Sequence, residues 1–111
     1  EGVVCGLLAG LSAIDDCSVD TSGRIFLLGG GAQSHAVCQI VADLTGKQVN
    51  VLNEPEIVAL GAARQAAAAL TGSWPTWKAS SRVAAEPVAS NDQKTTTRQR
   101  FAAARKKSFG V

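Results

Sequence analysis

The sequence predicts an α/β fold, with elements in the order α-β-α-β-α over residues 2–72. Three observations support this prediction. Apolar residues recur at helical spacing in three segments, two short apolar runs lie between these segments, and glycines mark the turns. Because a helical segment joins the two short runs, we expect two parallel strands linked by a right-handed crossover.

The first helix is predicted over residues 2–14, GVVCGLLAGLSAI. Its apolar face comprises four residues at spacing i, i+3, i+4 and i+7: Val4, Leu7, Leu8 and Leu11. Glycines at every fourth position form a second, smooth stripe: Gly2, Gly6 and Gly10. We expect this stripe to let another helix approach closely inside a packed core.

The first strand is predicted over residues 24–28, RIFLL, and a glycine turn follows it. The apolar run is continuous, which is typical of a strand that is buried on both faces of a parallel sheet. The next helix is predicted to begin after an N-cap at Ser34 and to end at Gly46. Its apolar stripe consists of Val37, Ile40, Val41 and Leu44.

The second strand is predicted over residues 47–52, and the third helix over Glu56–Leu70, with Pro55 near its first turn and a stop at Thr71-Gly72. Beyond this helix the sequence turns polar. Residues 78–97 are predicted to be mostly irregular. Residues 95–107 are predicted to form a basic helix whose one large apolar anchor is Phe101.

Charge divides the chain into two parts. Residues 1–77 have a net charge of −4, whereas residues 78–111 have a net charge of +6. A change of this size marks a boundary between a folded unit and a tail. We therefore predict a domain over residues 1–77 and a basic C-terminal tail over residues 78–111. The basic helix predicted within this tail is expected to be solvated. This tail lacks interleaved aromatic residues, so no nucleic acid is expected as a partner.

Composition excludes other classes of protein. No apolar run approaches the ~20 residues that cross a bilayer, and no secretory signal is present, so no membrane partner is expected. The three cysteines, Cys5, Cys17 and Cys38, form an odd set without metal-ligand spacing. We interpret them as reduced thiols of a cytoplasmic protein, with Cys5 and Cys38 in the core.

The glycine turn, Gly29-Gly30-Gly31-Ala32-Gln33-Ser34, is the one segment that points to chemistry. Glycines allow a ligand to approach the backbone, and the helix that follows offers free N–H groups to an anion. Three interpretations are open from the residues themselves. The turn could be a structural corner, or it could hold a nucleotide. It could also belong to a Rossmann-type dinucleotide fold of an oxidoreductase, with Glu54 after the second strand as the acidic residue.

Several longer motifs follow one another within residues 23–72. The first motif is GGGA-x-S at residues 29–34, directly after the predicted first strand. The second is QI-x-AD-x-x-G-x-x-V at residues 39–49, which spans the end of the second helix and the start of the second strand. The third is E-x-x-ALGAA at residues 56–63, in the third helix. This succession resembles the second adenosine-contacting region of the FGGY family of carbohydrate kinases, and GGGA followed by Ser is closer to the xylulokinase branch than to the glycerol kinases. The segment Glu1-Gly2-Val3 also resembles the start of the preceding helix in that family. The resemblance covers residues 1–77 well and the basic tail only loosely.

The resemblance implies a ribonuclease-H-like, actin-like ATPase C-terminal lobe that faces an N-terminal lobe across a cleft. It also implies that ATP, with Mg²⁺, lies against the glycine turn. The expected nucleotide-binding residues are Gly29, Gly30, Gly31, Ala32 and Ser34. No metal ligand is expected in this chain, and the segment from His35 to Cys38 departs from the family pattern.

The family transfers the γ-phosphoryl group of ATP to a primary hydroxyl of a sugar, here expected to be a pentulose. The resemblance places the catalytic carboxylate and the sugar pocket upstream of Glu1, in an N-terminal kinase lobe that is missing from this chain. Asp15 and Asp16 are expected to be solvated loop charges, and Asp43 a helix-surface residue.

Two parallel strands are too few to form a stable sheet. We therefore expect the chain to be a fragment, inactive in isolation, or to complete its sheet in an assembly such as a homodimer. A purely structural or interaction role is the remaining alternative.

Overall fold

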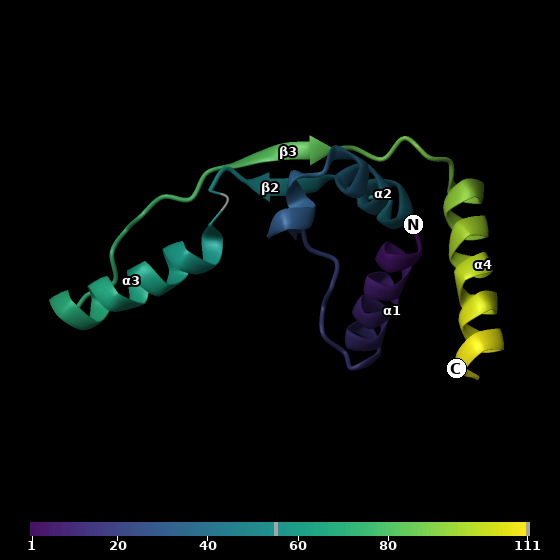
Figure 1. Ribbon diagram of the computed structural model, residues 1–111, viewed down its shortest axis with the longest axis horizontal. Coiled ribbons are helices and arrows are strands. Elements are labelled where there is room, and N and C mark those ends of the chain that lie inside the picture. Colours follow the sequence, from purple (N-terminus) through teal and green to yellow (C-terminus); the bar gives the residue numbers. More distant parts are fainter. Residues whose placement is uncertain (55, 111) are drawn as a thin grey trace.

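The computed structural model describes residues 1–54 and 56–110 of the chain. Within these residues the fold contains four α-helices, three strands and one 3-10 helix (Figure 1). Their bounds are α1 Gly2–Asp16, β1 Ile25–Leu27, η1 Gly30–Gln33, α2 His35–Thr45, β2 Val49–Leu52, α3 Ile57–Thr71, β3 Ser81–Ala85 and α4 Asn91–Phe109. The predicted order α-β-α-β-α is confirmed for the first five of these α-helices and strands. The expectation for Pro55 lies outside the described residues.

The three strands form one mixed sheet in the order β1-β2-β3. β1 and β2 are parallel, as predicted, and they pair from Ile25 with Val49 to Leu27 with Val51. β3 runs antiparallel to β2, so the prediction of an irregular chain over residues 78–97 is wrong here. Only Ala85 of β3 is buried. Because the other positions are not buried, the sequence of this strand, SRVAA, does not alternate between apolar and polar residues, and it gave no signal for a strand. Backbone pairing with β2 holds β3 in place.

The side chain of Asn50, in the middle of β2, is polar and buried. Its Nδ2 donates a hydrogen bond to the backbone oxygen of Ile25 on β1 at 3.2 Å, and its Oδ1 accepts one from Gln48 Nε2 at 3.1 Å. A buried amide is tolerated when its donors and acceptors find partners. Asn50 therefore ties β2 to β1 through a side chain as well as through the backbone.

α2 begins and ends where its sequence signals predicted, and four of its residues are buried in the core. The Ser34 hydroxyl accepts a hydrogen bond from Val37 N at the start of the helix, and Gly46 ends it in the left-handed conformation at φ 70°. The core residues come from α1, α2 and the sheet: Val4, Cys5, Leu8, Cys38, Val41, Ala42, Leu44, Val49, Val51 and Ala85. Cys5 and Cys38 are buried and free, as predicted, and Cys17 is free and exposed.

The buried face of α1 is displaced from the predicted one. Val4 and Leu8 are buried, together with Cys5, but Leu7 is 68% exposed and Leu11 is 38% exposed. α2 and α4 pack against α1 from a direction that covers positions 4, 5 and 8. The face that carries Leu7 is therefore exposed to solvent.

α4 begins four residues earlier than predicted because a capping box precedes it. The Ser90 hydroxyl accepts a hydrogen bond from Gln93 N, and the Gln93 side chain accepts one from Ser90 N. None of the described residues of α4 is buried, which agrees with a solvated helix. Phe101 is half-buried against the core, and its ring atom Cζ would lie 3.8 Å from a Cβ placed on Gly6. The expected close approach of a helix occurs at Gly6 alone, since a Cβ at Gly2 or Gly10 would meet none of the described residues within 4 Å and all three glycines are exposed.

Asp43, predicted as a plain helix-surface residue, instead anchors the chain between β3 and α4 to α2. Its Oδ1 accepts hydrogen bonds from Val88 N at 2.7 Å, Ala89 N at 3.0 Å and Gln39 Nε2 at 3.1 Å. These donors hold the pKa of the Asp43 carboxyl below its ordinary value, the Val88 bond being the largest cause. The sequence gives no hint of this contact, because 45 residues separate Asp43 from Val88.

β1 is an edge strand, so the prediction that it is buried on both faces is wrong for this chain. Phe26 is 39% exposed and Leu28, just beyond the strand, is 54% exposed. The reason is that no described strand pairs with the free edge of β1. The Arg24 guanidinium lies over the Phe26 ring, at 5.5 Å from the ring centroid. α3 extends away from the other helices and has no buried residue (Figure 1).

Candidate functional site

The glycine turn leaves β1 at its carboxyl end and leads into α2. Gly29 has φ 83° and ψ −169°, a conformation that is essentially restricted to glycine. The chain then forms η1, in which Ala32 N donates to Gly29 O at 3.1 Å and Ser34 N to Gly31 O at 3.2 Å. Local hydrogen bonds therefore fix the turn at its entry and exit.

The backbone of the turn is open on its outer side. A Cβ added at Gly29 or Gly30 would meet no atom within 4 Å, and one at Gly31 would meet only Val37 Cγ1, at 4.0 Å. Of these three glycines, Gly29 alone has a positive φ. The chain itself therefore requires glycine at position 29, whereas at positions 30 and 31 nothing described in this chain does. Close approach of a ligand is a reason for glycine at those two positions.

Ser34 and Ala32 take part in holding the turn against α2. The Ser34 hydroxyl accepts a bond from Val37 N at 3.4 Å, and the Ala32 carbonyl accepts one from the thiol of Cys38 at 3.4 Å. Ser34 is therefore the N-cap, as predicted. His35, the first residue of α2, is exposed.

A groove of about 450 Å³ lies beside this turn. It is lined by the ends of β1 and β2, the start of α3 and one residue of β3: Leu27, Leu28, Gly29, Ala32, Gln33, Val51, Leu52, Asn53, Glu54, Ile57 and Arg82. Open α/β sheets bind ligands in the crevice outside the carboxyl ends of their parallel strands. Of the five predicted site residues, the structure brings Gly29 and Ala32 into the groove lining, whereas Gly30, Gly31 and Ser34 do not line it.

Two charged residues line the groove. The Oε2 atom of Glu54 is buried and has no hydrogen-bond partner. Arg82 comes from β3, where it pairs with Val51. Sequence reasoning considered Glu54 only as part of a dinucleotide motif, and it missed Arg82 because residues 78–97 were expected to be irregular.

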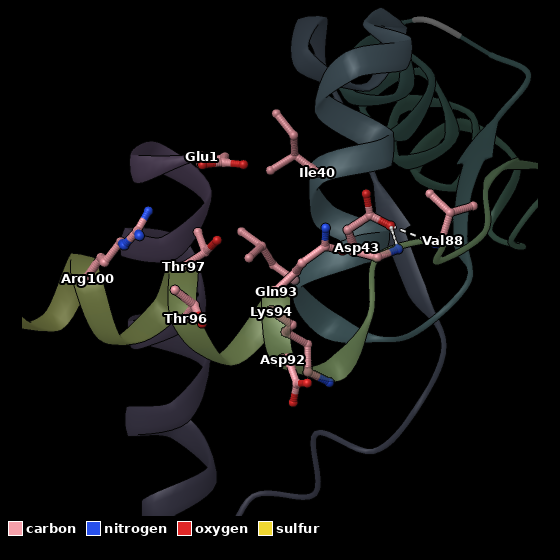
Figure 2. Close-up of a pocket in the computed structure, with 12 residues that line it drawn as sticks. Glu1, Ile40, Asp43, Val88, Asp92, Gln93, Lys94, Thr96, Thr97 and Arg100 are labelled. Atoms are coloured by element: carbon pink, nitrogen blue, oxygen red, sulfur yellow. Dashed lines mark hydrogen bonds between the residues drawn. The ribbon is translucent and has the colours of Figure 1, made fainter.

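A second cavity, of about 660 Å³, lies between α2, the segment that follows β3, and α4 (Figure 2). Its lining mixes both signs of charge, among them Asp43, Asp92, Lys94 and Arg100. The Asp43 oxygen that faces Val88 is already bonded to backbone N–H groups (Figure 2). This cavity is therefore a gap around a structural anchor, and the groove beside the glycine turn is the stronger candidate.

Among residues 1–54 and 56–110, no three His, Cys, Asp or Glu side chains gather as potential metal ligands. In the same residues, no helix combines the length and apolar character that a membrane span requires. Asp15 and Asp16 are exposed near the end of α1, away from the groove lining.

Comparison with known proteins assigns the chain to a family. Residues 1–70 match the C-terminal domain of the FGGY family of carbohydrate kinases. The chain is 47% identical over 75 residues to the xylulose kinase of Streptomyces rubiginosus and 44% identical over 72 residues to that of Streptomyces coelicolor. These matches cover 68% and 65% of this chain.

A ribulokinase of Vibrio parahaemolyticus is 41% identical over 83 residues, which cover 71% of this chain. The matched segments span 16%, 15% and 14% of the three relatives, so the chain corresponds to a small part of each. No solved structure matches significantly. The family match covers more than half of the chain and includes the glycine turn with the two parallel strands, and this chain therefore belongs to the FGGY family of carbohydrate kinases.

Proposed function

We propose that this chain is the C-terminal part of an ATP-dependent carbohydrate kinase and that its glycine turn contributes contacts to the nucleotide. The observation that supports this most directly is the open backbone of Gly30 and Gly31 at the carboxyl end of β1, within the residues that match the family. In the complete protein the reaction would be transfer of the ATP γ-phosphoryl group to a primary hydroxyl of a sugar. The names of the matched xylulose kinases and ribulokinase support a pentulose as the acceptor.

In this proposal, the turn binds ATP through backbone geometry. Gly29 adopts the glycine-restricted conformation that begins the turn, and Gly30 and Gly31 leave room for the ligand. The first N–H groups of α2 and the positive end of its dipole favour an anion nearby. Ser34 holds the start of α2 in place through its bond from Val37 N.

The remaining parts of the reaction belong to other segments of the complete enzyme. Phosphoryl transfer requires Mg²⁺ and a carboxylate that accepts the hydroxyl proton. The described residues gather no metal-ligand cluster, and a magnesium ion bound mainly by ATP phosphates and water fits this chain better than a protein cage. We assign this chain to one lobe of an actin-like kinase, with the catalytic carboxylate and the sugar pocket on the other lobe.

The dinucleotide interpretation has less support. A full helix, α1, precedes β1, and Ser34 occupies the position of the third glycine in the dinucleotide motif. The family match also favours a kinase over an oxidoreductase. Binding of NAD by the full-length protein in the absence of ATP binding would reverse this preference.

The decisive experiment uses Gly31→Val in the full-length kinase. The Cβ position at residue 31 is free of close contacts in the protein, so folding should survive, whereas the valine side chain would occupy the space of the ligand. We expect ATP affinity, measured by titration calorimetry, to fall at least about tenfold, or ~1.4 kcal/mol. Affinity for the sugar should change much less.

His35→Ala serves as the matched control, because His35 is exposed at the start of the same helix and its side chain has no contact with the nucleotide in this proposal. A melting curve must show that both variants fold. If folded Gly31→Val binds ATP as tightly as the wild type, the turn is a structural corner and the proposed site is wrong.

A further inference from the structure

We infer that Glu54 is a ligand-binding residue of the groove and that its carboxylate accepts hydrogen bonds from the ribose hydroxyls of the nucleotide. This inference rests on the proposed function, because it takes the ligand beside the glycine turn to be a nucleotide. The observation behind it is the buried Glu54 Oε2 atom, which has no hydrogen-bond partner in the protein.

An unpartnered buried carboxylate oxygen is costly. Buried polar side-chain atoms in proteins almost always have a hydrogen-bond partner, and a charged oxygen without one loses its hydration without replacement. Each exception calls for an explanation, such as a ligand that completes the site. Glu54 lines the groove, so a bound molecule with hydrogen-bond donors would provide the partner that its Oε2 atom lacks.

The strand register places Glu54 beside the glycine turn. Leu27 at the end of β1 pairs with Val51 of β2. Gly29 lies two residues beyond Leu27, and Glu54 lies three residues beyond Val51. Because neighbouring strands are about 4.8 Å apart, both residues emerge at the same edge of the sheet, one strand apart. A ligand on the glycine turn therefore lies within reach of the Glu54 carboxylate.

The chemistry of the groove favours a ribose as the donor. In dinucleotide-binding folds, a carboxylate at the end of the neighbouring parallel strand accepts hydrogen bonds from ribose hydroxyls while phosphate lies at the first glycine turn. The groove places Glu54 and Gly29 in the same relation, although this chain lacks the third glycine of the dinucleotide motif. The lining of the groove includes Leu27, Val51 and Ile57, which provide an apolar surface for the base. Arg82 lines the same groove and lessens the repulsion between Glu54 and the phosphates.

The test combines Glu54→Gln with a nucleotide that lacks the donors. In the full-length kinase, affinities for ADP and for 2′,3′-dideoxyADP are measured by calorimetry. We expect wild type to bind dideoxyADP about tenfold more weakly than ADP, and Glu54→Gln to bind ADP about tenfold more weakly than wild type does. The two losses should not add, because each removes the same hydrogen bonds.

Glu86→Gln is the matched control. Glu86 is exposed just after β3, which is antiparallel to β2, so it lies at the opposite edge of the sheet, and its ADP affinity should equal that of wild type. The inference is overturned if Glu54→Gln leaves ADP binding unchanged, or if it weakens ADP and dideoxyADP equally.

If Glu54→Gln fails to fold, the comparison of ADP with dideoxyADP in the wild type still tests the inference. Equal affinities of wild type for ADP and dideoxyADP would overturn the ribose contact while leaving the proposed function intact. If wild type binds neither nucleotide, the proposed function itself fails, and the role of Glu54 fails with it.

Discussion

The two edges of the sheet carry carboxylates in opposite surroundings. At the amino edge, near the end of α2, Asp43 Oδ1 accepts three hydrogen bonds. At the carboxyl edge, beside the start of α2, Glu54 Oε2 is buried without a partner. A carboxylate whose partners are all within the protein stabilises the fold, whereas one without a partner is available to a ligand. We call the first the structural edge and the second, where we propose that a ligand binds, the binding edge.

The largest expected effect on stability concerns the binding edge. Gly29→Ala would place a side chain on a backbone with φ 83° and ψ −169°, which costs about 2 kcal/mol in the folded state. Gly30→Ala provides the control, since Gly30 has no positive φ and a Cβ there meets nothing within 4 Å. Chemical denaturation of the full-length kinase would measure both variants. Equal free energies of unfolding for Gly29→Ala and Gly30→Ala would show that the turn can adopt another backbone conformation and does not require glycine at position 29.

A smaller loss is expected at the structural edge. Asp43→Asn keeps the shape of the side chain but removes the charge that strengthens its bonds from Val88 N and Ala89 N. We expect the free energy of unfolding to fall by about 1 kcal/mol. The same experiment on Asp92→Asn, in the first turn of α4, should give a smaller change. A neutral effect of Asp43→Asn would mean that the anchor contributes nothing.

The pH dependence of Asp43 sharpens this prediction. Its pKa in the folded protein is lowered, with the bond from Val88 N as the largest cause, and the unfolded value is about 3.9. A carboxyl with a lowered folded pKa contributes stability that is present above the unfolded value and is lost as the pH falls through the folded value. The stability difference between wild type and Asp43→Asn should therefore persist at neutral pH and shrink below about pH 4. A difference that is constant down to pH 2 would contradict this assignment.

The smallest effect on stability is expected from the corresponding change at the binding edge. Without nucleotide, Glu54→Gln removes no hydrogen bond of Oε2, because that atom has none to lose. The free energy of unfolding should stay within about 0.5 kcal/mol of wild type or increase. Thermal melts with and without ADP would separate the two states. A clear loss of stability in the absence of nucleotide would make Glu54 a structural residue like Asp43.

The elements that were predictable from sequence are those whose signals are local. α2 has its cap, its stripe and its final glycine within twelve residues of one another, from Ser34 to Gly46, and the parallel pair β1 and β2 follows from the helix between them. β3 was missed because its position depends on pairing with β2, and its residues carry little hydrophobic pattern. The buried face of α1 was displaced because helices distant in sequence decide which side is covered.

Local signals also explain why one part of the candidate site was predictable from the sequence and another was not. The glycine turn was visible because its residues are contiguous and their backbone requirements are local. The groove was not, since it joins Gly29, Glu54 and Arg82 from three separate strand ends. Burial of a single oxygen atom, the observation that singles out Glu54, is a property of packing that no sequence motif expresses.

Asn50 has a consequence for how this family member tolerates mutation. Its amide ties β2 to Ile25 of β1, and a slip of one residue between these strands would bury that amide without a partner and turn the alternate side chains of β2 to the other face. The spacing between Gly29 and Glu54 is set by this alignment. A variant such as Asn50→Val would thus leave every groove residue unchanged in the sequence and still alter how Gly29 and Glu54 are aligned, although Asn50 itself does not line the groove.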